Sequence, residues 1–416
     1  MSGGISRRRL LGWTGAGAAV AGVGAVSGYA LGRPDAPVAS PGQDVVDFRG
    51  THQAGIVTPS QNELYFTALD LTSTGKATVQ RMLSQWTTAA ERLTRGLETA
   101  ENGALPHNPE APPTDTGEAL ELPPSSLTVT IGFGSTFFDK LGITDRRPAA
   151  LADLPHLPPA NLDPNRSGGD LAVQACADDP VVAFHVIRNL ARIGRDSAVM
   201  RWSQLGFGNA TANGGGRQTP RNLLGFKDGT RNIPGDDGDL MGGHVWVGPE
   251  TDQSWMRGGS YLVARRIQMR IEAWDRDYLA DQQNVFGRHK YSGAPLTGTA
   301  ESDTPDFAAK GPSGEPVIPA GAHIRLAAPE NNGGVRILRR GYSYTDGIVA
   351  ASGELDAGLF FIAYQKDPRT QFVALQRRLG RDDALNEYIQ HVGSGLFACP
   401  PGSAGPGHAW AEELLA

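Results

Sequence analysis

Hydrophobic positions in the first third of the chain change from strand-like to helical spacing and back again. Glu63–Leu71 is rich in β-forming residues and is bounded by polar ones, which is typical of a strand. From Lys76 to Leu97 the apolar residues recur at nearly helical spacing, and glycine and proline interrupt the pattern from Gly103 onward. The alternation in Ser126–Phe133 predicts a second strand, and Ser135–Leu141 is expected to form a short helix.

The rest of the chain repeats this mixture of patterns. Strands are predicted for Val181–Ile187, for the long run Ser260–Ile271, for the alternating segment Ala322–Pro329 and for Gly358–Tyr364. A helix is predicted for Asp275–Phe286. No phosphate loop or dinucleotide fingerprint follows any of these strands, so the pattern gives no support to a Rossmann fold.

The length of the chain, 416 residues, favours two to three domains with a sizeable buried core. Asn209–Arg217 is rich in glycine and asparagine and is the best candidate for a linker between two halves. We therefore expect a boundary near Gly215, with an N-terminal domain over residues 46–214 and a C-terminal domain over residues 215–416.

Residues 1–45 are expected to be an export signal and a linker rather than part of the fold. Ser6–Leu11 contains three consecutive arginines and precedes the weakly apolar Trp13–Leu31, which is followed by a proline-rich stretch. This order is typical of a twin-arginine signal. A membrane anchor is the weaker alternative, because the apolar segment is short and rich in glycine. Cleavage after Ala30 and cleavage after Ala39 both remain open. The twin-arginine route carries folded proteins, often with a cofactor already bound.

The charge and the cysteine count exclude some classes of function. A net charge of -6 and a pI near 5.9 leave no basic face for nucleic acid. Cys176 and Cys399 are the only cysteines, too few for a cysteine-based zinc site or an iron-sulfur cluster. In an exported protein these two residues could form a disulfide. Two unpaired buried thiols are the favoured interpretation.

Two segments carry candidate chemistry. Asn222–Asn232 sets one acid, Asp228, among glycines that let the backbone approach a flat ligand closely. Taken in isolation, the Asp-Gly dipeptide favours a surface turn. Farther on, His323 lies in Ala-His-Ile-Arg-Leu-Ala, a turn-rich stretch follows it, and Arg339 comes next. Taken alone, these two residues fit a hydrogen-bonded strand histidine and a solvated charge. No histidine pair has the spacing of a zinc site.

The order of these motifs resembles the exported type of the dye-decolorising peroxidases, haem enzymes of bacteria and fungi. The family carries Gly-x-x-Asp-Gly, then a His-Ile-Arg-Leu-Ala segment, then Arg-Arg-Gly-Tyr, and this chain has them at Gly225–Gly229, His323–Ala327 and Arg339–Tyr342. Further likeness at residues 65–66, 179–185 and 387–391 extends the match over most of the chain from about residue 50.

The resemblance implies an α+β fold of two ferredoxin-like halves, each an antiparallel sheet flanked by helices, as in a dimeric α/β barrel. The second half is expected to hold one haem b, with His323 as the proximal iron ligand. Asp228 and Arg339 are expected on the distal side, where Asp228 relays a proton and Arg339 stabilises the negative charge on the leaving oxygen of peroxide.

Other residues have weaker roles by the same resemblance. Gly229, Thr230 and Arg231 are expected along the haem edge, with Arg231 either a propionate partner or a solvated charge. Asp356 is the candidate carboxylate partner of the proximal histidine, and a solvated turn acid is the alternative. Tyr342, Tyr344 and Trp246 are candidates to carry electrons from bulky substrates, with simple packing as their alternative.

The spacing of His323 and Arg339 sets a geometric condition. The two residues lie symmetrically about Asn331, so a tight hairpin would bring their Cβ atoms to about 5 Å of each other and leave no room for a haem. If both are haem residues, either the two strands part around Pro329–Gly334 or the two side chains reach past the haem edge to opposite faces.

We expect a haem peroxidase that uses hydrogen peroxide to oxidise bulky aromatic compounds such as dyes. A haem deferrochelatase or haem-binding protein in iron uptake is the main alternative, and a binding module without haem is a third. The export machinery is an expected partner and nucleic acid is not. Residence outside the cell or in the cell envelope, and assembly into a homo-oligomer, are left open.

Overall fold

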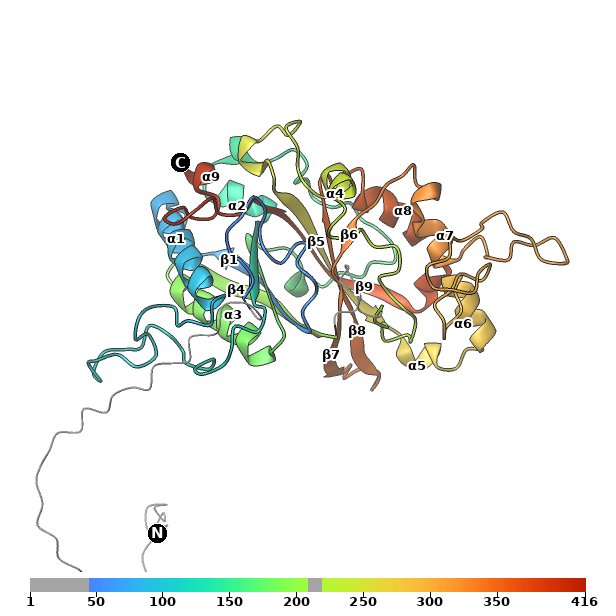
Figure 1. Ribbon diagram of the computed structural model, residues 1–416, viewed down its shortest axis with the longest axis horizontal. Helices are drawn as coiled ribbons and strands as arrows, with labels where there is room; N and C mark the ends of the chain where they lie inside the picture. The colour runs from blue at the N-terminus through green and yellow to red at the C-terminus, as the bar shows by residue number, and fades with distance from the viewer. Residues whose placement is uncertain (1–44, 209–218) are drawn as a thin grey trace, which may run out of the picture. The chain divides into compact units, whose positions relative to one another are not determined.

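Four strands of the N-terminal half form an antiparallel sheet in the order β2-β3-β1-β4, and the two long helices of this half, α1 and α3, lie side by side (Figure 1). The computed structural model describes residues 45–208 and 219–416. The strands are β1 (Glu63–Leu71), β2 (Thr128–Phe133), β3 (Leu171–Ala177) and β4 (Ala198–Phe207), with helix α1 (Lys76–Leu93) between β1 and β2 and helix α3 (Pro180–Gly194) between β3 and β4. This β-α-β-β-α-β order is ferredoxin-like.

The C-terminal half repeats the same order, β7-β8-β5-β9. Its strands are β5 (Ser260–Met269), β6 (Leu338–Arg339), β7 (Tyr342–Ile348), β8 (Leu355–Gln365) and β9 (Ile389–Cys399). Helices α5 (Ile271–Trp274), α6 (Leu279–Phe286) and α7 (His323–Ala327) lie between β5 and β6, and α8 (Phe372–Asp382) lies between β8 and β9. The short β6 pairs with β8 in the same register as β7, so β6 and β7 behave as one interrupted strand.

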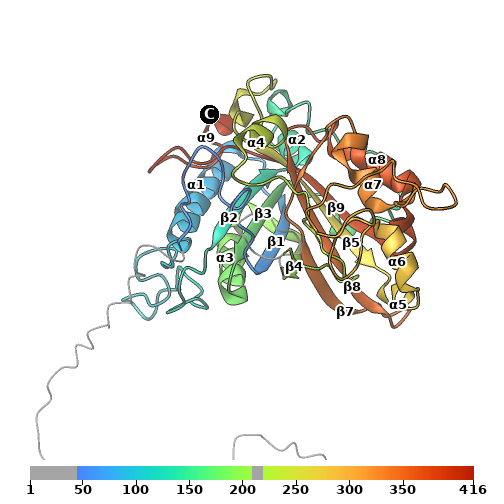
Figure 2. The same ribbon diagram turned by 45° about the vertical axis from the view of Figure 1, so that its right-hand side comes forward.

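The two sheets join into one closed antiparallel sheet (Figure 2). Phe133 of β2 pairs with Ala398 of β9, and Phe207 of β4 pairs with Ser343 of β7. Alternate residues of both halves point inward and pack into a shared core, which includes Phe66, Trp202, Tyr342, Tyr364 and Phe397. The predicted α+β fold of two ferredoxin-like halves is confirmed.

The helices cover the outer faces of the closed sheet. In α1, buried residues recur at helical spacing, and the Trp86 indole donates a hydrogen bond to the Leu190 carbonyl of α3 at 2.8 Å. On the second half, α8 lies over the outer face of β5, β8 and β9 (Figure 2). Shorter helices are α2 (Ser135–Lys140), α4 (Gly238–His244), α9 (Glu412–Leu415) and the 3-10 turns η4 (Pro329–Asn331) and η5 (Ala384–Glu387).

Most predicted elements are present, and two predicted strands are wrong. Val181–Ile187 belongs to helix α3, which starts after Asp179 because that side chain accepts hydrogen bonds from the Val181 and Val182 amides. Pro180 occupies the first helical position, where proline is favoured. The helix predicted for Asp275–Phe286 is present from Leu279 onward.

The other wrong strand is Ala322–Pro329, which contains helix α7 instead. The expected turn residues cap this helix. The Asn331 side chain donates to the Arg325 carbonyl at 2.8 Å, and the Asn332 side chain donates to the Leu326 and Ala328 carbonyls at 2.7 Å each. A short helix leaves the carbonyls at its C-terminal end without hydrogen-bond donors inside the helix, and these side-chain amides supply them. The segment therefore does not need to pair with a strand.

Several other sequence predictions can be placed. The linker Asn209–Arg217 and its boundary at Gly215 lie outside the described residues, as does the export signal. Cys176 and Cys399 are both buried and free. Within residues 45–208 and 219–416, none of the helices combines the length and the apolar character needed to cross a membrane.

Candidate active site

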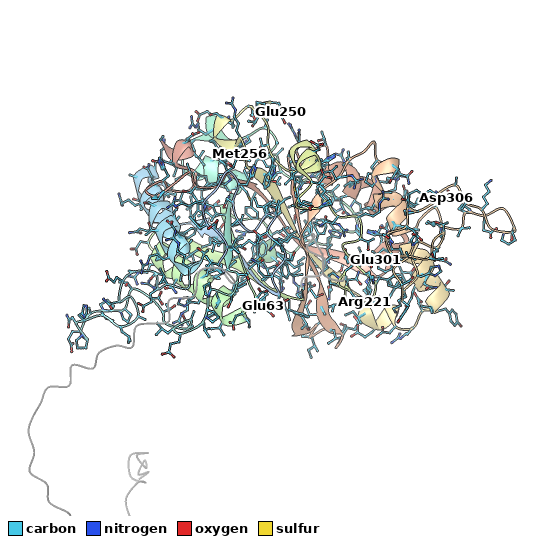
Figure 3. The ribbon with its side chains drawn as sticks, in the orientation of Figure 1. Glu63, Arg221, Glu250, Met256, Glu301 and Asp306 are labelled. Carbon is cyan, nitrogen blue, oxygen red and sulfur yellow. The ribbon has the colours of Figure 1, made fainter. Side chains whose placement is uncertain are left out.

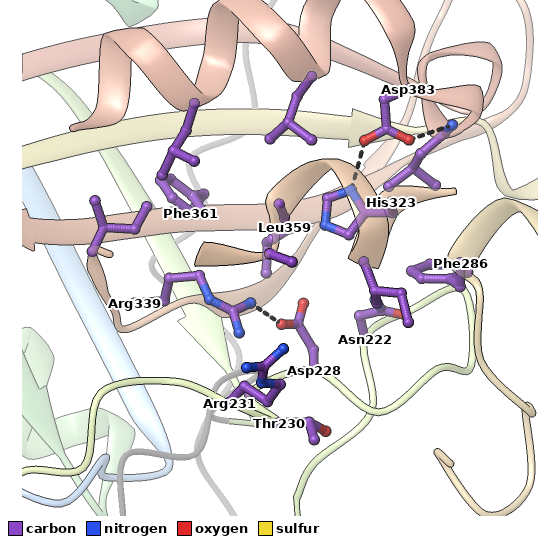
Figure 4. Close-up of a pocket in the computed structure, with 18 of the residues that line it drawn as sticks. Asn222, Asp228, Thr230, Arg231, Phe286, His323, Arg339, Leu359, Phe361 and Asp383 are labelled. Atoms are coloured by element: carbon purple, nitrogen blue, oxygen red, sulfur yellow. Dashed lines mark hydrogen bonds and ion pairs between the residues drawn. The ribbon is translucent and has the colours of Figure 1, made fainter. Parts of the chain in front are cut away.

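A pocket lies on the outer face of the C-terminal sheet, under helices α6, α7 and α8 (Figure 4). Its floor is apolar because residues of β5, β8 and β9 alternate, and those that face outward are mostly large hydrophobic residues. The floor residues are Ile267, Met269, Leu359, Phe361 and Ile389. Polar groups enter from the loop at residues 222–231, from α7 and from Arg339 at the end of β6.

Asp228 and Arg339 form an ion pair on one side of the pocket. Asp228 Oδ1 lies 2.5 Å from Arg339 Nη1, and both side chains are about three-quarters buried or more. Asn232 fixes their relative position, because its side chain accepts from the Arg339 amide at 2.9 Å and donates to the Arg339 carbonyl at 2.8 Å. The two motifs, far apart in sequence, are therefore joined by hydrogen bonds to the Arg339 backbone as well as by the Asp228–Arg339 ion pair.

The loop that carries Asp228 is anchored from behind. The Asn222 side chain accepts hydrogen bonds from the amides of Leu224 and Phe226, which curls the chain back on itself. The Phe226 ring stacks on Phe286 at 4.2 Å between centroids, and burial of these rings holds the loop on α6. Gly229 has φ +119°, a conformation that favours glycine, so the chain turns immediately after the acid.

His323 occupies the opposite side. It is the first residue of α7, and its Nδ1 lies 2.6 Å from Asp383 Oδ2. Asp383 is itself fixed, because its other oxygen accepts from the Leu385 amide at 2.9 Å and caps η5. Burial alone lowers the pKa of His323, but the neighbouring Asp383 carboxylate outweighs burial and the pKa is raised. The imidazole is thus oriented with its Nε2 free to face the pocket.

Figure 4 shows the His323 ring and the Asp228–Arg339 pair facing each other across the pocket. The geometric condition set by the sequence is met, because α7 and η4 replace a hairpin and carry residues 323–331 away from β6. The histidine and the arginine therefore come from different elements and lie on different sides.

Asp356 does not contact His323, so the predicted carboxylate partner is wrong. Strand alternation on β8 puts Asp356 on the inner face, where its Oδ1 accepts from Arg266 Nη2 at 2.8 Å. The residue that contacts His323 is Asp383, sixty positions farther along the chain. The only local signal for it was an acid placed directly before a short helical turn, which also fits an ordinary helix cap.

Three predicted edge residues, Gly229, Thr230 and Arg231, line the pocket. Thr230 Oγ1 donates to Glu301 Oε1 at 2.9 Å, and Glu301, labelled in Figure 3, also binds Lys227. Arg231 forms an ion pair with Glu330 of η4. Arg231 also has φ +64°, a strained value for a residue with a side chain, which is typical of functional positions.

The three candidate aromatics lie elsewhere. Tyr342 and Tyr344 are fully buried in the core inside the closed sheet, and their hydroxyl groups have no hydrogen-bond partner among the described residues. Trp246 is half-buried and stacks on His52, with ring centroids 3.6 Å apart and planes 3° apart. None of the three lines the pocket.

The donor set fits a haem. Within the described residues, no group of three or more His, Cys, Asp or Glu could hold a metal ion. A haem would need one side-chain ligand for its iron, and His323, which lines the apolar slot, would supply it. The guanidinium groups of Arg231 and Arg336 at the pocket wall suit the negative propionates of haem.

Comparisons with known proteins agree with this geometry. Residues 53–208 match the family model "Dyp-type peroxidase, N-terminal", and residues 219–404 match "Dyp-type peroxidase, C-terminal". The chain is 40% identical over 375 residues to a deferrochelatase of Yersinia pseudotuberculosis, covering 88% of this chain and 84% of that protein. A deferrochelatase of Escherichia coli strain K12 is 39% identical over 376 residues, covering 88% of this chain and 86% of that protein.

Solved structures give the same result. DtpA from Streptomyces lividans, in an oxyferrous/water mixed complex, is 40% identical with a TM-score of 0.82, and the match covers 90% of this chain and 98% of that one. A DyP-type peroxidase from Streptomyces coelicolor is 40% identical with a TM-score of 0.81 and the same coverage. With both family models matched along most of its length, the chain belongs to the dye-decolorising, or Dyp-type, peroxidases, a family of haem enzymes.

Proposed function

We propose that this haem peroxidase uses hydrogen peroxide to oxidise bulky aromatic compounds. His323 would hold the haem iron, and Asp228 and Arg339 would act on the peroxide. The observation that carries the proposal is the position of the Asp228–Arg339 pair, opposite His323 across an apolar slot. Bound haem would supply the redox centre at which peroxide is reduced to water.

The protein groups have separate tasks in this proposal. Asp228 Oδ1 is held by Arg339, while its Oδ2 has no hydrogen-bond partner among the described residues and can take a proton from one peroxide oxygen and return it to the other. The Arg339 guanidinium stays charged and stabilises the negative charge on the departing oxygen. Asp383 holds the Nδ1–H of His323, which strengthens the imidazole as an electron donor to iron.

The test is the rate at which peroxide changes the haem absorption spectrum, measured by stopped flow on the haem-loaded protein. Asp228→Asn is expected to slow this step by about 10²–10⁴-fold, and Arg339→Ala by about 10²–10³-fold. Asp356→Asn is the matched control, because Asp356 lies on the inner face of the sheet and should leave the rate unchanged. Equal rates in wild type and in both distal variants would remove the proposed roles.

Bulky substrates are proposed to react at the protein surface and to send electrons inward. The surroundings of the three aromatic candidates favour Trp246 over the tyrosines. Oxidation of a tyrosine releases its hydroxyl proton, but Tyr342 and Tyr344 have no hydrogen-bond acceptor among the described residues. Arg266 also lies over the Tyr344 ring at 4.1 Å, and its positive charge opposes loss of an electron. Trp246 is partly exposed and stacked on His52, so it can meet a substrate.

A second candidate is removal of iron from haem with release of the intact porphyrin. The relatives named deferrochelatases favour it, since the chain covers most of their length. Incubation of the haem-loaded protein with a dye, with and without peroxide, separates the two functions. A peroxidase given peroxide oxidises many dye molecules per haem. A deferrochelatase instead yields metal-free protoporphyrin, which is detected by its fluorescence.

A further inference from the structure

Two buried basic side chains that the proposed mechanism does not use lie at the wall of the pocket and directly behind it. Arg265 of β5 is 1% exposed and His391 of β9 is 3% exposed. Both point to the outer face of the sheet, as do the pocket residues Ile267 and Ile389 of the same strands. A register shift between Arg266 and Ile267 places Ile267 opposite His391 and Arg265 opposite Ser394, so Arg265 and His391 are diagonal neighbours.

His391 lines the pocket, and Arg265 lies directly behind the wall. The guanidinium of Arg265 stacks over the ring of Phe372, with Cζ 5.4 Å from the ring centroid. Phe372 and Phe361, the β8 neighbour of Arg265, both line the pocket. Residues Pro158–Ala160 lie alongside β9 at this point, because the Pro159 carbonyl accepts from the His391 amide at 3.0 Å.

Neither side chain has a hydrogen-bond partner among the described residues. Nε and Nη1 of Arg265 and Nδ1 of His391 are fully buried and unpaired. The next residue of β5 shows the contrast, because the buried Arg266 binds Gln204, Asp346 and Asp356. A second fully buried arginine, Arg340, binds the Thr58 carbonyl and the Gln61 side chain. Arg265 is thus a buried cation that lacks a compensating anion in the protein itself.

A buried cation without an anion is costly, and its retention points to a ligand that supplies the negative charge. Burial lowers the pKa of Arg265 to about 10, so the guanidinium remains charged at neutral pH. Burial and the charge of Arg265 lower the pKa of His391 to about 3, so its ring is neutral and can donate one N–H. Arg265 therefore supplies positive charge behind the pocket wall, and His391 supplies a hydrogen-bond donor at the wall.

We propose that Arg265 and His391 form a buried subsite for a carboxylate, and that one propionate of haem occupies it. The proposal rests on haem binding in this pocket. His391 lines the apolar slot, and a carboxylate beside it would accept a hydrogen bond from the imidazole and lie within the field of the guanidinium behind it. A free small organic acid is a different source of the same chemistry, and the experiment below distinguishes the two.

The test compares Arg265→Met and His391→Phe with the matched control Arg266→Met on the adjacent residue. Haem affinity is measured by titrating the haem-free protein and following the haem absorption band, and stability by the Tm of the haem-free protein. Arg265→Met and His391→Phe are expected to weaken haem binding by about tenfold or more. The Tm of haem-free Arg265→Met should stay the same or rise, because an uncompensated charge is removed.

Arg266→Met should behave in the opposite way. It leaves Asp346 and Asp356 without their cation and is expected to lower the Tm while changing haem affinity less than twofold. If Arg265→Met also lowers the Tm and leaves haem affinity unchanged, Arg265 has only a structural role and the subsite is refuted.

The source of the carboxylate is tested with iron protoporphyrin IX dimethyl ester, which has no free carboxylates. If a haem propionate occupies the subsite, the affinity difference between wild type and Arg265→Met disappears with the ester. If the difference persists with the ester and acetate raises the Tm of the wild type but not of Arg265→Met, the occupant is a free acid and the haem assignment is overturned. A wild type that binds neither porphyrin would refute haem binding itself, which is a separate outcome.

Discussion

At the scale of single residues, two aspartates with the same chemistry acquire different roles from their neighbours. Asp228 lies beside the guanidinium of Arg339, and Asp383 lies beside the imidazole of His323. The first carboxylate faces the side of the pocket where peroxide is proposed to bind. The second faces away from the pocket centre and fixes a ring nitrogen. The position in the pocket and the ionisable partner, an arginine for Asp228 and a histidine for Asp383, separate the two roles.

The role of Asp383 can be tested without removing its helix cap. In Asp383→Asn the side chain keeps one carbonyl oxygen, which can still accept from the Leu385 amide, but loses the negative charge next to His323 Nδ1. The imidazole then becomes a weaker donor, so the reduction potential of the bound iron is expected to rise. Spectroelectrochemical titration of the haem-loaded protein measures this change.

Asp356→Asn is the control for the same titration, since Asp356 binds Arg266 on the other face of β8. A potential that does not move in Asp383→Asn, or that moves equally in the control, would contradict the assigned role of Asp383.

The residues of the site differ in how well the sequence predicted them. Asp228, His323 and Arg339 each lie in a contiguous motif whose order resembles the family, and the structure brings all three to one pocket. Asp383 has no motif, and its contact with His323 spans sixty residues. Arg265 and His391 lie in hydrophobic strands, and only their burial without partners draws attention to them.

At the scale of elements, hydrophobic periodicity predicted the strands better than the short helices. Strands β1 and β5 are continuous runs of nine and ten residues, whereas the apolar run at the start of α3 is brief and resembles a strand. Helix α7 has five residues, fewer than two turns, so its periodicity cannot be distinguished from alternation. In both cases the deciding information was in the caps, Asp179 before α3 and two asparagines after α7.

A cluster of charged side chains holds the long connection between α1 and β2 against helix α3. His185 of α3 lies 2.7 Å from Glu118 through Nδ1 and 3.4 Å from Asp115 through Nε2. Asp115 in turn accepts from the amides of Thr99 and Gly117, at 2.8 Å each, and so folds the connection between α1 and β2. Because both ring nitrogens face carboxylates, the cluster is satisfied only by the protonated imidazole.

This cluster predicts a pH dependence of stability. Burial lowers the pKa of His185, but hydrogen bonds to Asp115 and Glu118 outweigh it and raise the pKa. The contribution of His185 is therefore complete below its unfolded pKa, about 6.5, and is lost as pH rises through the folded value. Burial raises the pKa of Glu118, but bonds from Thr116 and His185 lower it to about 2, so its contribution is complete above about pH 5 and is lost only in acid.

We expect His185→Gln to cost about 1–3 kcal/mol of unfolding free energy between roughly pH 5 and 6.5, and less at higher pH. Denaturant unfolding of wild type and variant across pH 5–9 measures the difference. His107→Gln, on the exposed part of the same connection, is the control and should show no difference. A difference that does not change with pH would exclude the charged form of His185.

At the scale of the whole molecule, the closed sheet makes the two halves depend on each other. Strand β2 near residue 130 pairs with β9 near residue 398, so the sheet closes only when almost the whole chain is present. Periodicity predicted a mixture of strands and helices. It did not predict the order of the strands within the sheet or the closing of the sheet, because both depend on pairings between residues far apart in sequence. The family resemblance supplied the architecture, and the boundary near Gly215 stays a prediction.

The closing of the sheet limits how the protein can be exported with haem bound. The pocket proposed to hold haem is lined by residues from 222 to 391, so it is complete only after the C-terminal strands are in place. A protein loaded with haem inside the cell must then cross the membrane folded, which is what the twin-arginine route allows. We therefore propose that residues 1–45 direct the folded, haem-loaded protein to the cell envelope or beyond.

The prediction is specific to two of the three arginines near the N-terminus. The double substitution Arg7→Lys and Arg8→Lys keeps the charge but removes the guanidinium groups, and lysine does not replace arginine where the planar group itself is recognised. We expect the variant to accumulate inside the cell in folded, haem-loaded form, whereas Arg9→Lys should be exported like the wild type. Cell fractionation, with the haem absorbance of each fraction, measures both outcomes. Export of the double variant at the wild-type level would show that a different route carries this protein, because a twin-arginine signal depends on that pair.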